Sequence, residues 1–240
     1  MNALFNPNDP NVAMLERVAK RLGPQLCSKF AFVGGAVAGL LITDPAHPSI
    51  RPTLDVDIVV EVLALTDYHQ IENALRERGF APDMHPDAPL CRWQIDGVTV
   101  DVMPTDEAIL GFANRWYPMC VSSAQALTLP GGTLLRVIRA PLFVATKLEA
   151  FHGRGAGDYL FSHDLGDIVS LLDGRQSLLD ECRQMPLDLQ TYLGDQFTAL
   201  LANRNFLDAL PGHLPTDPAS QRRVGILQAV LRQMAALGKA

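Results

Sequence analysis

Cysteine is scarce in this sequence, and no two cysteines form a Cys-x-x-Cys motif. Small domains that depend on disulfides are rich in cysteine, and structural zinc sites use closely spaced cysteine pairs. The pattern therefore excludes a disulfide scaffold and predicts no zinc site. We expect reduced and mostly buried thiols in a cytoplasmic protein. The four residues are Cys27, Cys91, Cys120 and Cys182.

Long apolar runs and an excess of positive charge are also missing. No stretch approaches the roughly 18 consecutive apolar residues that a membrane helix needs. The first ten residues lack the cationic start and apolar run of a secretory signal, so we expect no membrane partner. The formal net charge of −6 argues against a broad basic surface for nucleic acid, although it leaves room for a local basic groove. With 240 residues, the chain is long enough for one large domain or two small ones.

A glycine pair and an Asp-x-Asp motif are the most informative features that the sequence contains. Gly34 and Gly35 follow an apolar strand, and Asp55 and Asp57 begin a second one at 55–62. Residues two apart on a strand point to the same face, so the two carboxylates share one patch of space. Carboxylates this close repel each other unless a cation lies between them, and oxygen ligands suit Mg²⁺ bound to a phosphate substrate. The motif predicts a site for a metal-bound nucleotide.

A third acid belongs to a predicted β-hairpin. Segments 91–95 and 98–103 are joined by Asp96-Gly97, a dipeptide typical of two-residue turns. Asp101 interrupts the apolar alternation of the second segment and faces away from its valines. If this strand neighbours the Asp-x-Asp strand, Asp101 reaches the same metal site.

The order of the apolar patterns predicts an α+β fold in two domains. Up to residue 140 we expect strands alternating with helices, and after Pro141 apolar residues recur at helical spacing throughout. We predict domains at 1–140 and 141–240. The expected helices are 12–22, 36–42, 66–78, 106–112, 141–152, 162–173, 187–210 in one or two pieces, and a last one from 217 onward.

The acids lie within a longer motif, Arg51-x-Thr53-x-Asp55-x-Asp57. With the glycine pair and Asp101, it resembles the nucleotidyltransferase superfamily that has the DNA-polymerase-beta-like palm. The Gly-Gly-Ala turn, the Arg-x-Thr lead-in and the helical second half look most like the AbiEii/AbiGii group, the nucleotidyltransferase toxins of type IV toxin–antitoxin pairs and their relatives. Two later segments also resemble that group, 145–151 and 163–168. The resemblance implies a mixed-sheet palm followed by a C-terminal helical bundle.

The resemblance also implies an activity. It is the transfer of a nucleoside monophosphate from an NTP such as ATP to an acceptor hydroxyl, with release of pyrophosphate. Two Mg²⁺ ions, or Mn²⁺ in their place, would neutralise the phosphates. Asp55 and Asp57 would hold the triphosphate-side metal, all three acids would hold the other, and Asp101 would help to deprotonate the attacking hydroxyl. The backbone at Gly34 and Gly35 would approach the β- and γ-phosphates.

Four charged residues are further candidates for nucleotide binding. Arg51 either contacts a phosphate or pairs with a nearby acid. Lys147 is either a cation for the triphosphate or a solvated surface lysine. Asp164 and Asp167 lie on one side of a predicted helix, near its N-terminus. Either their negative charges interact favourably with the helix dipole, or they contact the nucleotide or Lys147.

Three functions remain open from the sequence. In the first, the acceptor is RNA such as tRNA, and a toxin-like enzyme has an antitoxin protein as partner. In the second, the acceptor is a small molecule, such as an aminoglycoside or lincosamide-type antibiotic, which the acidic balance fits slightly better. In the third, the chain is a catalytically silent module that binds a nucleotide or a partner.

Overall fold

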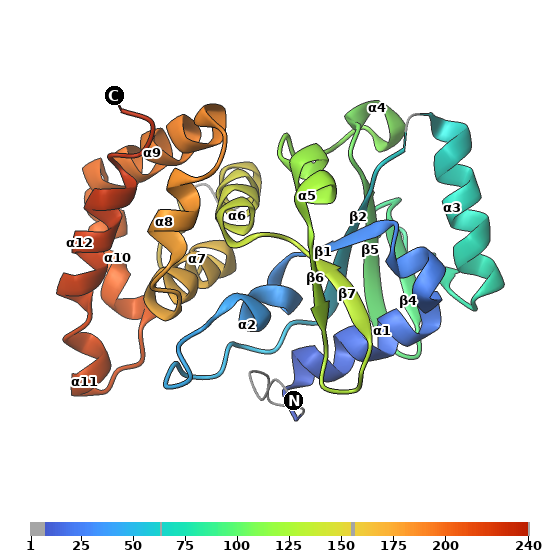
Figure 1. Cartoon of the computed structure of the whole chain (residues 1–240), viewed down its shortest axis with the longest axis horizontal. Helices are drawn as coiled ribbons and strands as arrows, with labels where there is room; N and C mark the ends of the chain where they lie inside the picture. The colour runs from blue at the N-terminus through green and yellow to red at the C-terminus, as the bar shows by residue number, and fades with distance from the viewer. Residues whose placement is uncertain (1–7, 63, 155–156, 240) are drawn as a thin grey trace. The chain divides into compact units, whose positions relative to one another are not determined.

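The computed structural model describes residues 8–62, 64–154 and 157–239, and the chain forms two compact units (Figure 1). The first, which we call the sheet unit, comprises Met1–Leu40 and Ser49–Leu142. The second, the helical unit, comprises Leu41–Pro48 and Phe143–Ala240. The short segment Leu41–Pro48 thus belongs with the later helices, which the sequence pattern did not indicate.

Within the described residues, the sheet unit holds a seven-stranded mixed sheet in the order β3-β4-β5-β2-β1-β7-β6. β2 is parallel to β5 and β1 is parallel to β7, whereas the other neighbours are antiparallel. A mixed sheet followed by helices confirms the predicted α+β class. The strands are β1 Phe30–Val33, β2 Asp55–Val60, β3 Ala81–Pro82, β4 Arg92–Ile95, β5 Val98–Pro104, β6 Gln125–Thr128 and β7 Leu134–Val137.

Helices of the sheet unit cover its central strands. β1 is buried at all four positions because β2 and β7 flank it and both α1 and α5 pack against it. α3 is fixed by Tyr68, whose buried hydroxyl donates to the Val102 carbonyl of β5 at 2.8 Å. The helices of this part of the chain are α1 Pro10–Cys27, the 3-10 helix η1 Gly35–Val37, α2 Ala38–Leu41, α3 Leu65–Glu77, α4 Glu107–Leu110 and α5 Tyr117–Ser123.

The first helix extends beyond its predicted end. α1 begins under the cap of Asp9, whose side chain accepts from the backbone N–H groups of Asn11 and Val12. Gly23 breaks it with a φ of 72°, where the sequence predicts the end, but the chain then adds another helical turn to Cys27. Pro24 favours this restart because proline lacks an N–H and suits the first position of a helix.

The predicted helix at 36–42 is replaced by two shorter pieces. Gly34, with a φ of 70°, precedes the 3-10 helix η1, and α2 follows for a single turn. The segment that follows, Leu41–Pro48, belongs to the helical unit. There the backbone N–H groups of Thr43 and Asp44 both donate to the Gly174 carbonyl at 3.0 Å. This anchoring ends the helix at Leu41.

The helical unit continues in helices, as the apolar spacing predicts. The predicted segment 187–210 divides at Asn203, whose side chain caps the second piece by accepting from the N–H groups of Asn205 and Phe206. No helix among the described residues has the length and apolar character needed to cross a membrane. The elements are α6 Ala140–Arg154, α7 His163–Gly174, α8 Leu178–Arg183, α9 Leu187–Ala202, α10 Arg204–Ala209, the 3-10 helix η2 Leu210–His213, α11 Pro218–Gln221 and α12 Val224–Met234.

All four cysteines are buried, as predicted, and each carries a free thiol. Burial raises the pKa of Cys27 to about 11 and the pKa values of Cys91 and Cys182 to about 12. Burial also raises the pKa of Cys120. Since the thiolate is the nucleophile, these side chains are inert packing groups at neutral pH.

The turn of the β4–β5 hairpin provides a test of the fold. Asp96 and Gly97 have φ values of 48° and 74°, as the predicted two-residue turn requires. A Cβ added at Gly97 would have no atom within 4 Å, so Gly97→Ala tests the cost of the positive φ without steric overlap. We expect it to lower the free energy of unfolding by about 1–2 kcal/mol in urea titrations. Gly153→Ala, in α6 and equally open, should instead be neutral or stabilising, and equal effects of the two changes would contradict this account.

Candidate metal centre

The pairing of β2 with β5 brings the three acids together. The two strands are parallel, and Asp57 is the register partner of Asp101, whereas Asp55 pairs with Thr99. Asp55 and Asp57 share a face because they lie two apart on β2. The intervening Val56 is fully buried on the other face, which fixes the direction of the acids. The prediction for Asp101 required these two strands to be neighbours in the sheet, and they are.

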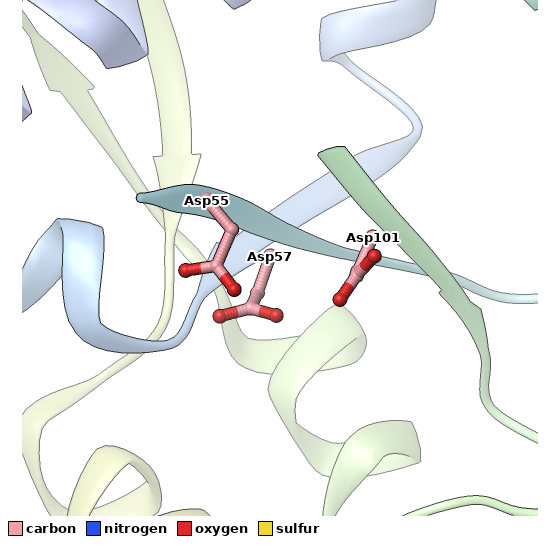
Figure 2. Close-up of side chains that lie close together, drawn as sticks. All are labelled: Asp55, Asp57 and Asp101. Carbon is pink, nitrogen blue, oxygen red and sulfur yellow. The ribbon is translucent and has the colours of Figure 1, made fainter. Parts of the chain in front are cut away.

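The three carboxylates form one compact cluster. Figure 2 shows Asp55 and Asp57 on one strand and Asp101 on its neighbour, with the side chains on the same side of the sheet. One oxygen from each acid lies within 4.8 Å of those of the other two. Asp101 is buried, with 8% of its surface exposed, and the other two are half-buried. This set of oxygen donors fits Mg²⁺ or Mn²⁺, which prefer carboxylate ligands.

Gly34 provides the space that Asp57 occupies. Val33, the residue before it, is the register partner of Asp57 across β1 and β2. A Cβ at Gly34 would lie 2.8 Å from the Asp57 Cβ and would overlap the carboxylate itself. The sequence interpretation gave Gly34 and Gly35 to phosphate binding, which stays a prediction. The contact with Asp57 is a second reason for glycine at position 34.

Arg92, which the sequence interpretation missed, is bonded to the most buried of the three acids. Its Nε and Nη2 donate to the two oxygens of Asp101 at 2.8 and 2.7 Å. These hydrogen bonds raise the pKa of Arg92 although burial opposes its charge. Arg92 of β4 is the register partner of Asp101 on β5. The signal was available, because positions equally distant from the Asp96-Gly97 turn face each other.

Asn11 holds the chain that leads into β2. Its Nδ2 donates to the Arg51 carbonyl at 3.1 Å, and its Oδ1 accepts from the Thr53 N–H at 2.9 Å. The Thr53 hydroxyl in turn donates to the Asp55 carbonyl at 3.1 Å. A buried asparagine of α1 thereby sets where Asp55 begins its strand. The Arg51 residue itself is exposed, and its contact with a phosphate stays a prediction.

A separate charged cluster lies in the helical unit. Lys147 of α6 forms ion pairs with Asp164 at 3.0 Å and Asp167 at 2.6 Å, both on α7. Arg154 adds two hydrogen bonds to Asp164, at 3.0 and 3.1 Å. The side chains of Lys147, Asp164 and Asp167 are only 8%, 5% and 3% exposed. The interpretation of Lys147 as a solvated surface residue is wrong, and the interpretation of Asp164 and Asp167 as its partners is confirmed.

The charges of this cluster compensate one another. Burial opposes the charge on Lys147, but Asp167 and Asp164 outweigh it and raise the pKa of Lys147. Burial likewise opposes the charge on Asp164, and the hydrogen bonds and charges of Arg154 and Lys147 hold its pKa below the usual value. The cluster is thus a closed arrangement that joins α6 to α7. Nucleotide binding by Lys147, Asp164 and Asp167 stays a prediction.

Comparisons with known proteins give no family. No protein-family description matches the sequence, and no curated protein matches it. Among solved structures, the crystal structure of JHP933 from Helicobacter pylori is similar with a TM-score of 0.45 and 12% sequence identity, over 93% of this chain and 90% of that chain. A likeness this distant carries no argument, so the function must be inferred from the residues of this chain.

The contact between Gly34 and Asp57 predicts the effect of one methyl group. Gly34→Ala places a Cβ where the Asp57 carboxylate lies and forces alanine into a φ of 70°. We expect at least about 2 kcal/mol of destabilisation from strain and overlap together, and weaker Mn²⁺ binding by calorimetry. Gly111→Ala has a φ of 80° but open space around the Cβ. This control should lose stability without loss of Mn²⁺ affinity, and a Gly34→Ala protein with unchanged affinity would disprove the role of the contact.

The cluster around Lys147 should behave as a buried ion pair. Lys147→Met leaves two buried carboxylates without their shared cation, so we expect a loss of about 3–5 kcal/mol in unfolding free energy at pH 7. Lys20→Met, which breaks an exposed ion pair with Glu16, should cost less than about 1 kcal/mol.

The pH dependence of this stability has a defined sign. The pKa of Asp164 is lower in the folded protein than the ordinary value of 3.8. Its contribution is therefore present above about pH 3.8 and is lost as the pH falls through the lowered folded value. In Lys147→Met, burial without the cation favours protonated acids, so the difference from wild type should narrow as the pH falls toward 4. A difference that is constant between pH 7 and pH 4 in urea titrations would contradict the assignment.

Proposed function

We propose that the sheet unit is the palm of a metal-dependent nucleotidyltransferase, which transfers a nucleoside monophosphate from an NTP to an acceptor hydroxyl. The proposal depends on one observation. The register of β2 against β5 brings Asp55, Asp57 and Asp101 together, so that one carboxylate oxygen of each acid lies within 4.8 Å of those of the other two. Carboxylates this close together repel one another unless a cation lies between them. A divalent cation bound among the three acids would relieve this repulsion, which supports the cluster as the functional site.

The residues of the site would act mainly by positioning and charge. Asp55 and Asp57 would hold the ion on the triphosphate side, and together with Asp101 they would hold a second one. Divalent ions bound there neutralise charge on the phosphates. Asp101 would orient the acceptor hydroxyl and take its proton while the oxygen forms a bond to the α-phosphorus and the bond to pyrophosphate breaks. The backbone at Gly34 and Gly35 would contact the β- and γ-phosphates.

We propose RNA as the acceptor, in a toxin-like activity of the AbiEii/AbiGii kind with an antitoxin as partner. The resemblance of Arg51-x-Thr53-x-Asp55-x-Asp57 supports this choice. The second candidate acceptor is a small cationic molecule such as an aminoglycoside. The net charge of −6 favours it, because an acidic protein attracts cations and repels the phosphates of RNA.

Transfer of label from nucleotides tests the proposal directly. Wild-type protein, Mg²⁺ and each α-labelled NTP are incubated in parallel with total RNA and with a set of aminoglycosides and lincosamides. We expect label in one acceptor class, and a loss of at least about a hundredfold in Asp57→Asn, since even residues that only support a metal ligand change activity by 10–100-fold. Asp87→Asn is the matched control, because the Asp87 side chain is 92% exposed, and it should keep full activity.

The result also separates the remaining functions. Label on RNA supports the toxin-like enzyme, and label on a drug supports the small-molecule enzyme. Binding of an NTP with Mg²⁺ in calorimetry, without any transfer, would replace both by a silent binding module. Equal transfer by wild type and Asp57→Asn would reject the metal centre as the active site.

A further inference from the structure

The bond between Arg92 and Asp101 uses the oxygens that a metal ion would need. Both carboxylate oxygens of Asp101 accept from one guanidinium, at 2.8 and 2.7 Å. The pair is well formed, because its residues are register partners on adjacent antiparallel strands. Bidentate arginine–carboxylate pairs of this kind are among the stronger hydrogen-bonded contacts in proteins.

A second pair of the same kind shows what is special about Arg92. Arg21 bonds both oxygens of Asp96 at 2.6 and 2.9 Å, also in the sheet unit. The Arg21 and Asp96 side chains are 53% and 35% exposed, and Asp96 belongs to the hairpin turn. The side chains alone of Arg92 and Asp101 are 30% and 11% exposed, and Asp101 belongs to the acidic cluster. The first pair ties a turn to a helix, whereas the second places a fixed positive charge beside a candidate metal ligand.

Two effects of that charge act in the same direction. Hydrogen bonds to Arg92 reduce the electron density that Asp101 offers to a metal ion. The guanidinium also repels any cation that approaches the cluster, and it keeps its charge because arginine does not deprotonate in proteins. A carboxylate has about four lone-pair sites, so an ion and Arg92 can share Asp101, but each weakens the other.

We propose that Arg92 competes with a divalent cation for Asp101, and so lowers the affinity of the acidic cluster for metal that arrives without nucleotide. This inference rests on the proposed function. Arg92 is a positioning residue, since it acts through Asp101. When a cation takes an Asp101 oxygen, the bond from Arg92 to Asp101 weakens, and the partly exposed guanidinium can bind an anion such as the phosphates of an NTP. Metal and nucleotide would then favour each other's binding, as linkage between two ligands requires.

Mn²⁺ binding to the full chain in the absence of nucleotide tests the competition. Free Mn²⁺ is followed by its electron paramagnetic resonance signal in titrations of metal-stripped protein. We expect Arg92→Gln to bind Mn²⁺ at least about fivefold more tightly than wild type, the lower end of typical coupling between sites. Arg92→Lys keeps the positive charge but loses the bidentate hydrogen bond to Asp101. Its Mn²⁺ affinity should therefore lie between those of wild type and Arg92→Gln. Arg21→Gln removes the matched pair and should leave the affinity unchanged.

Thermal unfolding supplies a readout that does not depend on activity. Removing Arg92 leaves its buried partner uncompensated, so Arg92→Gln should unfold at a lower temperature than wild type without metal. Saturating Mn²⁺ should then raise its unfolding temperature by more than it raises that of wild type. Arg21→Gln should show the same Mn²⁺-dependent rise as wild type. If Arg92→Gln does not fold, the comparison of Arg92→Lys with wild type carries the test.

The outcomes separate this inference from the proposed function. Weaker or equal Mn²⁺ binding by Arg92→Gln, or by Arg92→Lys alone, overturns the competition and leaves Arg92 as a support for Asp101. In that case, loss of Mn²⁺ binding in Asp57→Asn still upholds the metal centre. If neither wild type nor Arg92→Gln binds Mn²⁺ at millimolar concentration, both proposals fall. Binding by Arg92→Gln where wild type shows none supports the competition in its strongest form.

Discussion

The parallel register of β2 against β5 is the constraint on which the candidate site depends. It pairs Asp57 with Asp101, and the two-residue repeat of a strand then carries Asp55 to the same face. Neither strand could slip by one residue without turning its acids into the apolar interior that Val56 and Val100 now fill. Hydrophobic burial on one face of the sheet therefore determines the geometry of charges on the other.

The two charged clusters of the chain show different electrostatic arrangements. Around Lys147, two buried acids pair with two cations, so the charges of this cluster are balanced within the helical unit. In the sheet unit, three acids lie together, and the cation bonded to Asp101 is Arg92. Buried charges are retained at a cost in desolvation, and among the three acids a bound cation would offset both that cost and their mutual repulsion. This contrast is the physical reason why we propose the acids of β2 and β5, and not the Lys147 cluster, as the functional site.

Patterns that depend on neighbours in sequence were predictable. The Asp96-Gly97 turn, the shared face of Asp55 and Asp57, and the run of helices after residue 141 all follow from local spacing and turn chemistry. The clustering of Asp101 with the pair required one more assumption, that two strands distant in sequence are adjacent. The burial of Lys147 could not be predicted, because an amphipathic pattern alone does not distinguish a paired lysine from a solvated one.

The missed residues are those that act across the fold. Asn11 positions the lead-in to β2 from a helix 40 residues away in sequence, and no local pattern reports such a contact. Gly34 is required by the Asp57 side chain, which becomes visible only when two strands are placed side by side. Arg92 is different, because counting outward from the hairpin turn pairs it with Asp101. The register that the turn defines is sufficient to predict that pairing.

The shortness of the β4–β5 turn limits how this protein can be altered. An inserted residue there would change which positions of β4 face those of β5 and would separate Arg92 from Asp101. The loop between β6 and β7, around Gly131 and Gly132, joins two strands that contribute none of the three acids. An insertion in the second loop would leave the pairing of Arg92 with Asp101 unchanged, but it would disturb the hydrogen bond from the Gly131 N–H to Glu16.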